Sequence, residues 1–495
     1  MNQLKYFLSI PLFFILLYSC NPKHEKQEQK PNVIFIFVDD LRTELGCYGN
    51  EHIHSPNLDK LAENGFLFTH HYVNIPTCGA SRHCLLTGQL PVSVAHTRNS
   101  ITAETLSEQP EKDIPETFIH HLKRNGYYTV GIGKISHHPD GYVYGYLDEP
   151  GNQLELPHSW NEMLLDDEKW GSGHNAFFGY ADGTNRNSLN KEVKPYECAD
   201  VPDEDYPDGL TATRAIKKLN ELKSKDQPFF LGVGFFKPHL PFTAPKKYWD
   251  MYNRDELPVA PFAGIPGNSS KASLHRSGEF NQYKLGEEKA SLDGPVSDDY
   301  ARKARHAYFA CVSFIDAQIG KLLDEVDKLE LAENTIVVVW GDHGWHLGDH
   351  LVWGKHTIFD RALHSTFMMR VPGMKNSKTI NKIVSTTDIY PTLMELCGTP
   401  VSHSLDGNSL TTLMKNPGDS EWRNTAYSYW RKGFSVRTDD YRLMKYYRNE
   451  EPGIELYNHN DDPNETKNVA AGHPEIVDEL LPVLEEGNTI KDYQR

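Results

Sequence analysis

The sequence predicts an α/β protein in which a central, mostly parallel sheet is flanked by helices and a small antiparallel sheet follows at the C-terminal end. Continuous apolar runs at 33–38, 228–236 and 334–340 are typical of strands buried on both faces of a parallel sheet. Helix-forming segments at 210–225 and 300–329 lie between these runs along the chain. Strands that alternate with helices in this way favour a parallel α/β sheet.

The C-terminal part of the chain has a different pattern. Short aromatic segments, which favour the strands of a small antiparallel sheet, occur at 430–436, 441–447 and 454–458, with a closing helix at 473–486. The 495 residues exceed the usual size of a single domain. We therefore predict a main domain at 31–418 and a smaller α+β domain at 419–495.

The first thirty residues have the pattern of an export signal. Lys5 precedes an apolar run at 6–17, which is too short to span a membrane and suits a signal peptide. Ser19 and Cys20 then resemble a bacterial lipobox, so we predict a lipoprotein signal at 1–20 and a polar tether at 21–30. The chain would be exported and anchored through Cys20 in the periplasm or on the surface of a Gram-negative cell. An ordinary signal peptide with an incidental cysteine is the alternative.

The charge of the chain limits its partners. A net charge of -17 argues against a nucleic-acid-binding protein, which would carry a basic surface. Any affinity for an anionic substrate must instead come from a local basic pocket. The irregular segments 140–205 and 255–298 are the candidates for the walls of such a pocket.

Polar residues follow four predicted strands at the point where each strand ends. Asp39 and Asp40 follow the first run, and a helix at 114–125 leads to a strand at 127–132 that is followed by Lys134, His137 and His138. The remaining two sets are Lys237 with His239, and Asp342 with His343. Because the carboxyl ends of parallel strands share one edge of a sheet, these side chains should meet there.

A cysteine segment at 76–88 is the remaining candidate for chemistry. It contains Cys78-x-Ala80-Ser81-Arg82 and closes with 86-Leu-Thr-Gly-88. If the segment is helical, Arg82 lies on the same face as Cys78 and offers a fork of N–H donors for a tetrahedral oxyanion. A buried cysteine at the start of a core helix is the alternative reading of the cysteine alone.

This C-x-A-S-R and L-T-G pattern resembles the signature of the formylglycine-dependent sulfatases of the alkaline phosphatase superfamily. Four other segments resemble the same family: P-N-V-x-x-I-x-x-D-D at 31–40, G-K-x-x-H at 133–137, K-P-H-x-P-F at 237–242, and G-D-H-G-x-x-L-G-D-H with W-x-K at 341–355. The resemblance runs from about Pro31 to the C-terminal helix. It implies an alkaline-phosphatase-like sandwich. The G-K-x-x-H spacing and the Asp-His pair resemble the iduronate-2-sulfatase branch.

The resemblance also implies a role for each candidate residue. A maturation enzyme would oxidise Cys78 to formylglycine (3-oxoalanine), whose hydrate is the nucleophile. One Ca²⁺, in preference to Mg²⁺, would be bound by Asp39, Asp40, residue 78, Asp342 and His343. Arg82, Lys134 and Lys355 would surround the sulfate, His239 would protonate the leaving oxygen, and His137 would take a proton from the second hydroxyl of the hydrate. Lys237 and His138 are further candidates for substrate contacts.

The implied activity is hydrolysis of sulfate esters on a sulfated polysaccharide or its oligosaccharides. The branch features point to 2-sulfated uronic acids, and algal polysaccharides such as ulvan remain open. Two alternatives are a phosphodiesterase or phosphonate monoester hydrolase of the same superfamily, and an inactive glycan-binding lipoprotein. Apart from Cys20 and Cys78, five scattered cysteines show no disulfide framework but leave one or two bridges open: Cys47, Cys84, Cys198, Cys311 and Cys397.

Overall fold

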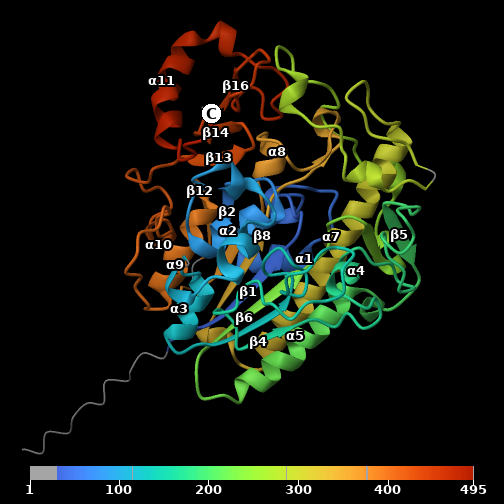
Figure 1. Ribbon diagram of the computed structural model, residues 1–495, viewed down its shortest axis with the longest axis vertical. Helices are drawn as coiled ribbons and strands as arrows, with labels where there is room; N and C mark the ends of the chain where they lie inside the picture. The colour runs from blue at the N-terminus through green and yellow to red at the C-terminus, as the bar shows by residue number, and fades with distance from the viewer. Residues whose placement is uncertain (1–29, 114, 286, 375–376, 494–495) are drawn as a thin grey trace, which may run out of the picture.

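An eight-stranded sheet forms the centre of the molecule (Figure 1). The computed structural model describes residues 30–113, 115–285, 287–374 and 377–493, so the predicted signal peptide, Cys20 and nearly all of the tether lie outside the described residues. The sheet has the order β12-β2-β11-β8-β1-β6-β3-β4. Its strands are β1 (Asn32–Val38), β2 (Phe66–Tyr72), β3 (Tyr128–Gly133), β4 (Glu162–Leu164), β6 (Phe229–Phe235), β8 (Thr335–Gly341), β11 (Phe367–Arg370) and β12 (Lys378–Ser385). Only β11 runs antiparallel to its neighbours, which confirms the predicted mostly parallel sheet.

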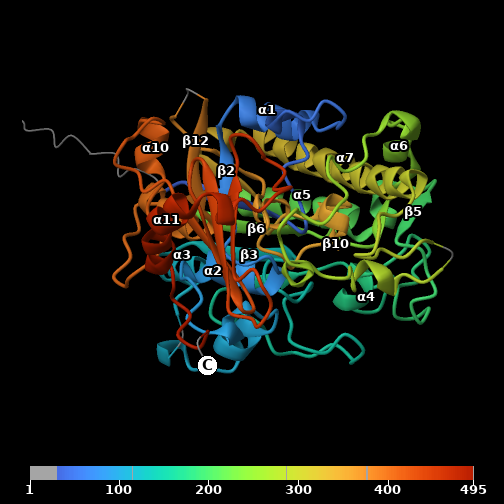
Figure 2. The same cartoon turned by 90° about the horizontal axis from the view of Figure 1, so that it is seen from above.

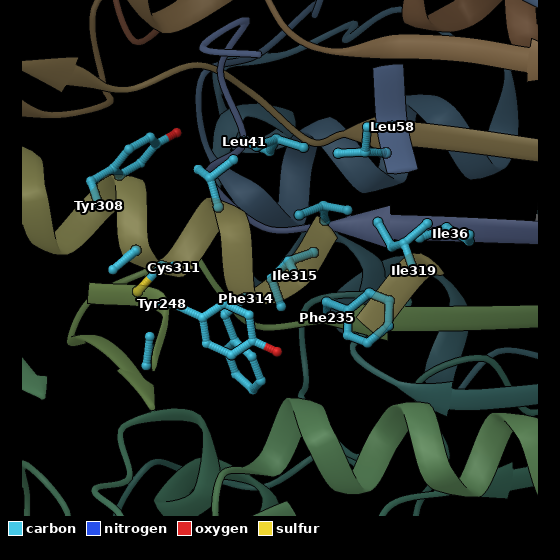
Figure 3. Packing of buried hydrophobic residues seen from close by; sticks show 14 of the residues in the cluster. Ile36, Leu41, Leu58, Phe235, Tyr248, Tyr308, Cys311, Phe314, Ile315 and Ile319 are labelled. Atoms are coloured by element: carbon cyan, nitrogen blue, oxygen red, sulfur yellow. The ribbon is translucent and has the colours of Figure 1, made fainter. Parts of the chain in front are cut away.

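Helices cover both faces of the sheet because its central strand is apolar on both sides. In β1, Ile34 and Ile36 point into one core and Phe35 and Phe37 into the other. The first core is closed by α1 (Pro56–Glu63), α5 (Pro207–Lys223) and α7 (Asp298–Lys328); Figure 3 shows Ile315 and Ile319 of α7 in it. The second core is closed by α2 (Cys78–Thr87), α3 (Phe118–Arg124), α9 (Ile389–Leu396) and α10 (Thr411–Lys415). Figure 2 shows α1 and α7 on one side of the sheet and α2 and α3 on the other.

The C-terminal part forms a second, smaller sheet, shown in red at the top of Figure 1. Its strands pair antiparallel in chain order: β13 (Ala426–Trp430), β14 (Gly433–Arg437), β15 (Tyr441–Tyr446) and β16 (Ile454–Asn458). The helix α11 (Pro474–Glu486) packs on this sheet and shares a core with it. The predicted antiparallel sheet is confirmed, and the predicted strand at 430–436 corresponds to β14, which begins later, at Gly433. That segment contains a hairpin turn at Arg431 and Lys432, so four strands form instead of three.

The remaining elements are short and lie in the irregular segments. They are α4 (Gly173–Phe177), β5 (Tyr196–Ala199), β7 (Phe242–Pro245), α6 (Lys246–Trp249), β9 (His346–Leu347), β10 (Trp353–Gly354) and α8 (Asp360–Leu363). The predicted helix at 114–125 begins later, at Phe118, because the Thr117 side chain accepts a hydrogen bond from the N–H of His120 and caps the helix there. The domain boundary at 418/419 stays a prediction.

The described residues contain neither a disulfide bond nor a candidate membrane-spanning helix. All six described cysteines, Cys47, Cys78, Cys84, Cys198, Cys311 and Cys397, are unpaired. Within the same ranges, none of the helices has the length and apolar character required to cross a bilayer.

Candidate active site

Four neighbouring strands bring the predicted residues to one edge of the sheet. The strands β8, β1, β6 and β3 are adjacent and parallel, so the segments that follow them start side by side. Asp342 and His343 follow β8, Asp39 and Asp40 follow β1, Lys237 and His239 follow β6, and Lys134 and His137 follow β3. The N-terminus of α2 reaches the same edge and carries Cys78 as its first residue.

The tight packing of α2 accounts for the small residues that follow Cys78. All ten residues of the helix are buried. A Cβ atom on Gly79 would lie 2.1 Å from the carbonyl oxygen of Asn99, so this position has no room for a side chain. The Ser81 hydroxyl donates to the carbonyl of Asp342 at 2.5 Å and ties the helix to the end of β8. Gly88 ends the helix at a φ of 65°, which glycine adopts without strain.

Four side chains form a group that could hold a metal ion. One ligand atom from each of Asp39, Asp40, Cys78 and His343 lies within 4.8 Å of the others. Oδ1 of Asp39 and Oδ2 of Asp40 are buried and find no hydrogen-bond partner within the described part of the chain. Burial raises the pKa of Asp40 to about 7, although Lys355 and His343 oppose the rise. Unpaired buried carboxylate oxygens fit a hard divalent cation, which would supply the missing charge.

The backbone around this group is fixed by hydrogen bonds. Asp40 has a φ of 59°, an uncommon conformation for a residue with a side chain. Its N–H donates to Oδ1 of Asp342 at 2.9 Å, and its carbonyl accepts from the Tyr308 hydroxyl at 2.7 Å. Nδ1 of His343 lies 3.0 Å from the carbonyl of Gly344, which leaves Nε2 facing the Cys78 sulfur at 3.3 Å. The ring nitrogen nearer to the cysteine is thus free to act as a ligand.

Two lysines flank the cysteine. Nζ of Lys355 lies 2.9 Å from Oδ1 of Asp40 and 3.3 Å from the Cys78 sulfur, and Lys134 pairs with Asp39. Burial disfavours both ammonium groups, but Asp39 raises the pKa of Lys134 and Asp40 raises that of Lys355. Burial also raises the pKa of the Cys78 thiol well above its usual value, despite the two lysines. The unmodified thiol is therefore a poor nucleophile at neutral pH.

Besides His343, two of the predicted histidines reach the site. Nε2 of His239 lies 3.9 Å from Oδ2 of Asp40, and its Nδ1 lies 2.6 Å from the carbonyl of Leu240. Burial and the nearby Lys355 lower the pKa of His239 to about 4. His137 lines the cavity described below, and its Nε2 lies 3.2 Å from the hydroxyl of Tyr146.

Glu279 is a site residue that the sequence analysis missed. Its Oε1 lies 3.1 Å from Nε2 of His239, and its Oε2 lies 3.7 Å from Nζ of Lys355. Burial opposes ionisation of this carboxyl group, yet Lys355 and His239 hold its pKa well below the usual value. No sequence signal could have singled it out, because it is one of several acidic residues in the irregular segment 255–298.

Four of the predicted residues have most of their polar atoms engaged in the surrounding structure, although Nη2 of Arg82 is buried without a hydrogen bond in the described part of the chain. Nε of Arg82 lies 3.0 Å from Oδ2 of Asp342, and the Asp40 N–H donates to the other oxygen, Oδ1. Asp342 lies outside the four-residue group. Nζ of Lys237 donates to the carbonyls of His239 and Pro241 at 2.9 and 2.7 Å. His138 faces Glu155, 3.1 Å away. None of these four side chains lines the cavity described next.

A cavity of about 1280 Å³ opens above Cys78. Its walls come from residues of 140–205 and 255–298, as predicted, and also from the small C-terminal sheet. The cations along it are Lys134, Arg186, Lys191, Arg276, Lys284, Lys355, Arg431, Lys432 and Arg448, whereas its only carboxylates among the described residues are Glu279 and Glu450. A chain with a net charge of -17 thus surrounds this one cavity with positive charge.

The sequence from 31 to 399 matches the sulfatase family model, and 348–488 matches the model of the C-terminal part of N-sulphoglucosamine sulphohydrolase. The chain belongs to the sulfatase family. This confirms the predicted membership of the alkaline phosphatase superfamily and the predicted class of enzyme, a sulfuric ester hydrolase.

Individual relatives agree with this assignment. The sulfatase is 31% identical over 446 residues to the iduronate 2-sulfatase of Mus musculus, which covers 81% of this chain and 74% of the relative. It is 28% identical over 433 residues to an ulvan-active sulfatase of Formosa agariphila, and the match covers 83% of this chain and 71% of the relative. Among solved structures, a phosphonate monoester hydrolase from Silicibacter pomeroyi has a TM-score of 0.72 at 23% identity. The match covers 92% of this chain and 95% of that structure. At that identity the similarity shows the fold alone.

Proposed function

We propose that this sulfatase hydrolyses sulfate esters of a sulfated polysaccharide or its oligosaccharides, with Cys78 matured to formylglycine and one Ca²⁺ at the carboxylate group. The observation that carries the proposal is the cationic cavity that ends at Cys78, between Lys134 and Lys355. Binding an anionic ester there requires local positive charge, because the chain as a whole repels anions. Formylglycine would supply a hydrated aldehyde as nucleophile, and the cation would polarise the ester.

The residues of the chain account for the remaining requirements of ester hydrolysis. Lys134 and Lys355 are held on either side of residue 78 by carboxylates, so they can neutralise the charge of the sulfate group without moving. His239 lies at the wall of the cavity beside Glu279 and is the candidate proton donor to the leaving oxygen. His137, on another wall, is the candidate base. Arg82 supports the site through Asp342.

Two relatives support the proposed substrate class. One is an iduronate 2-sulfatase and another is described as active on ulvan, so both act on uronic-acid-containing or algal saccharides by name. A substrate with 2-sulfated uronic acids is therefore our first candidate, and ulvan is the second. Export as a lipoprotein anchored through Cys20, and maturation by a formylglycine-generating enzyme, belong to the same proposal.

The first experiment measures sulfate release from defined sulfated oligosaccharides, together with the peptide mass around residue 78. We expect release by the matured protein, loss of at least about a thousandfold in kcat for Cys78→Ala, and no turnover by protein that retains the thiol. Full turnover by protein with an intact Cys78 thiol would contradict the proposed nucleophile. Saccharide binding without sulfate release across the panel would favour an inactive glycan-binding protein.

The second experiment addresses the metal ion and the rival reaction. Removal of divalent cations with a chelator should abolish activity and lower the melting temperature, because Oδ1 of Asp39 and Oδ2 of Asp40 are then buried without a partner. Ca²⁺ should restore both, and Mg²⁺ less completely. An aryl sulfate and an aryl phosphate diester are then compared under the same conditions. Faster cleavage of the diester would assign the protein to the phosphodiesterase alternative.

A further inference from the structure

A buried arginine lies in the cavity wall, apart from the cations around Cys78. Arg186 belongs to the irregular segment between α4 and β5 and is only 8% exposed. Its guanidinium carbon lies 3.6 Å from the ring centre of Phe178 and 5.8 Å from that of Tyr283. The same side chain lines the cavity. The group is thus removed from bulk water but open to a ligand in the cavity.

This guanidinium has aromatic neighbours but no anionic partner within the described ranges. No carboxylate lies within ion-pair distance of it there, and its Nε is buried without a hydrogen bond. The local fold does not need the charge, because the loop is held by backbone bonds such as Arg186 N–H to the Phe178 carbonyl and Tyr180 N–H to the Thr184 carbonyl. An unpaired buried charge is costly, so its presence requires another explanation.

Two aromatic side chains, Phe178 and Phe177, lie between Arg186 and the residues around Cys78. The Phe178 ring beneath it packs against Phe177, with ring centres 4.8 Å apart. Phe177 in turn lies 4.4 Å from the His239 ring and 4.2 Å from Nζ of Lys134. Two aromatic rings therefore separate Arg186 from the residues expected to hold the reacting sulfate. A ligand with two anionic groups could occupy both positions at once.

We propose that Arg186 forms a second anion subsite, which binds a carboxylate or a second sulfate group on the saccharide whose sulfate ester lies at Cys78. The planar fork of a guanidinium can bind either anion through two parallel hydrogen bonds. The nearby Lys191 and Lys284 line the same cavity and add positive charge, although Lys284 has Glu192 at 3.7 Å. This inference rests on the proposed function and narrows it to substrates that carry at least two negative charges.

The test uses binding rather than turnover. Full-length Cys78→Ala protein is titrated by calorimetry with two probes: a disaccharide ending in a 2-sulfated uronic acid, and D-glucosamine 2-N,6-O-disulfate. The first probe offers a carboxylate as its second anion and the second offers another sulfate. Adding Arg186→Gln should weaken binding of at least one probe about tenfold or more, as expected for loss of a charge-assisted hydrogen bond.

A matched control removes the same charge elsewhere. Arg124 lies on α3, is 62% exposed and pairs with Glu116 at 2.6 Å on the surface. Arg124→Gln should change both affinities by less than about twofold, because a surface ion pair contributes little. Thermal melting of the Arg186→Gln protein is measured alongside, to show that the variant is folded at the temperature of the titration even though it loses the contact with Phe178.

Each result has a defined meaning. Weaker binding of the uronate probe alone assigns a carboxylate to the subsite, and weaker binding of the disulfate alone assigns a sulfate. If Arg186→Gln matches the control with both probes, or if the parent binds neither probe, the subsite is overturned. Hydrolysis of an aryl sulfate by the intact matured protein tests the proposed function separately, so the two failures can be told apart.

Discussion

Glu279 links the candidate proton donor to a lysine of the site, which makes it a positioning residue. Its carboxylate faces His239 and Lys355 together and opposes the lowering of the His239 pKa by burial and by that lysine. Glu279→Gln removes this support, so the protonated form of His239 becomes rarer. We expect kcat to fall by at least about tenfold, with a smaller change in KM.

The pH profile distinguishes this role from a structural one. If His239 must be protonated to act, activity falls as the pH rises through its pKa. The variant lowers that pKa, so the fall in kcat should begin at a lower pH than in the parent. Glu450→Gln, which removes an exposed carboxylate from the rim of the same cavity, should leave the profile in place. An equal shift in both variants would show a general effect of charge.

Gly79 provides a residue-scale test of how closely α2 is packed. Alanine is the better helix former by about 1 kcal/mol, but its Cβ would lie 2.1 Å from a backbone oxygen. The cost of this steric clash should exceed the gain in helix propensity, so Gly79→Ala should lower the free energy of unfolding by about 1–3 kcal/mol. Denaturant unfolding measures the difference. Gly472→Ala is the control, because nothing lies within 4 Å of that added Cβ. Equal stability of the two variants would contradict the packing argument.

These residues also show what could be predicted from the sequence. Asp39 and Cys78 were found because each lies in a chain-local pattern, an apolar strand or a five-residue motif. Glu279 and Arg186 were not, because their neighbours His239 and Phe178 reach them only through the folding of irregular segments. Lys237 belongs to a motif, yet its ammonium turns to backbone carbonyls, an orientation that residue order does not encode.

At the scale of elements, a buried charge network attaches the small sheet to the main body. Arg442 of β15 is fully buried and lies 2.7 Å from both Asp360 of α8 and Glu465. His459 completes this cluster, 2.9 Å from Glu465. Asp360, His459 and Glu465 also lie close enough together to hold a metal ion, but the guanidinium already pairs with both carboxylates. The network therefore holds β15 against the segment that follows β10.

Removing that arginine should release the contact. Arg442→Met leaves the buried Glu465 and the partly buried Asp360 without the guanidinium, which costs about 3–5 kcal/mol. Lys445→Met, on the same strand, breaks a partly exposed pair with Glu485 and should cost about 1 kcal/mol or less. Chemical denaturation of both variants provides the comparison. Similar losses would show that the network contributes no more than a surface pair.

At the scale of the whole molecule, the charge of the body and the charge of the cavity have opposite signs. A polyanionic substrate is repelled at a distance and attracted only within about 10 Å of the cavity. Because the short-range attraction acts on more charges of a saccharide than of an aryl sulfate, added salt should raise KM more steeply for the saccharide. Assays from about 0.05 to 0.5 M NaCl measure the two slopes. Parallel slopes would contradict a multiply charged binding site.

The burial of α2 sets an order of events in time. Every residue that surrounds Cys78 in its motif is inaccessible once the sheet, α9 and the loop at Asn99 have closed over it. The proposed maturation enzyme, if it reads Ala80, Ser81 and Arg82, would therefore have to meet the chain before it folds. Under the proposed function, folding and maturation would then compete, and a chain that folds first would keep its thiol. The yield of active protein should then depend on how slowly this segment folds.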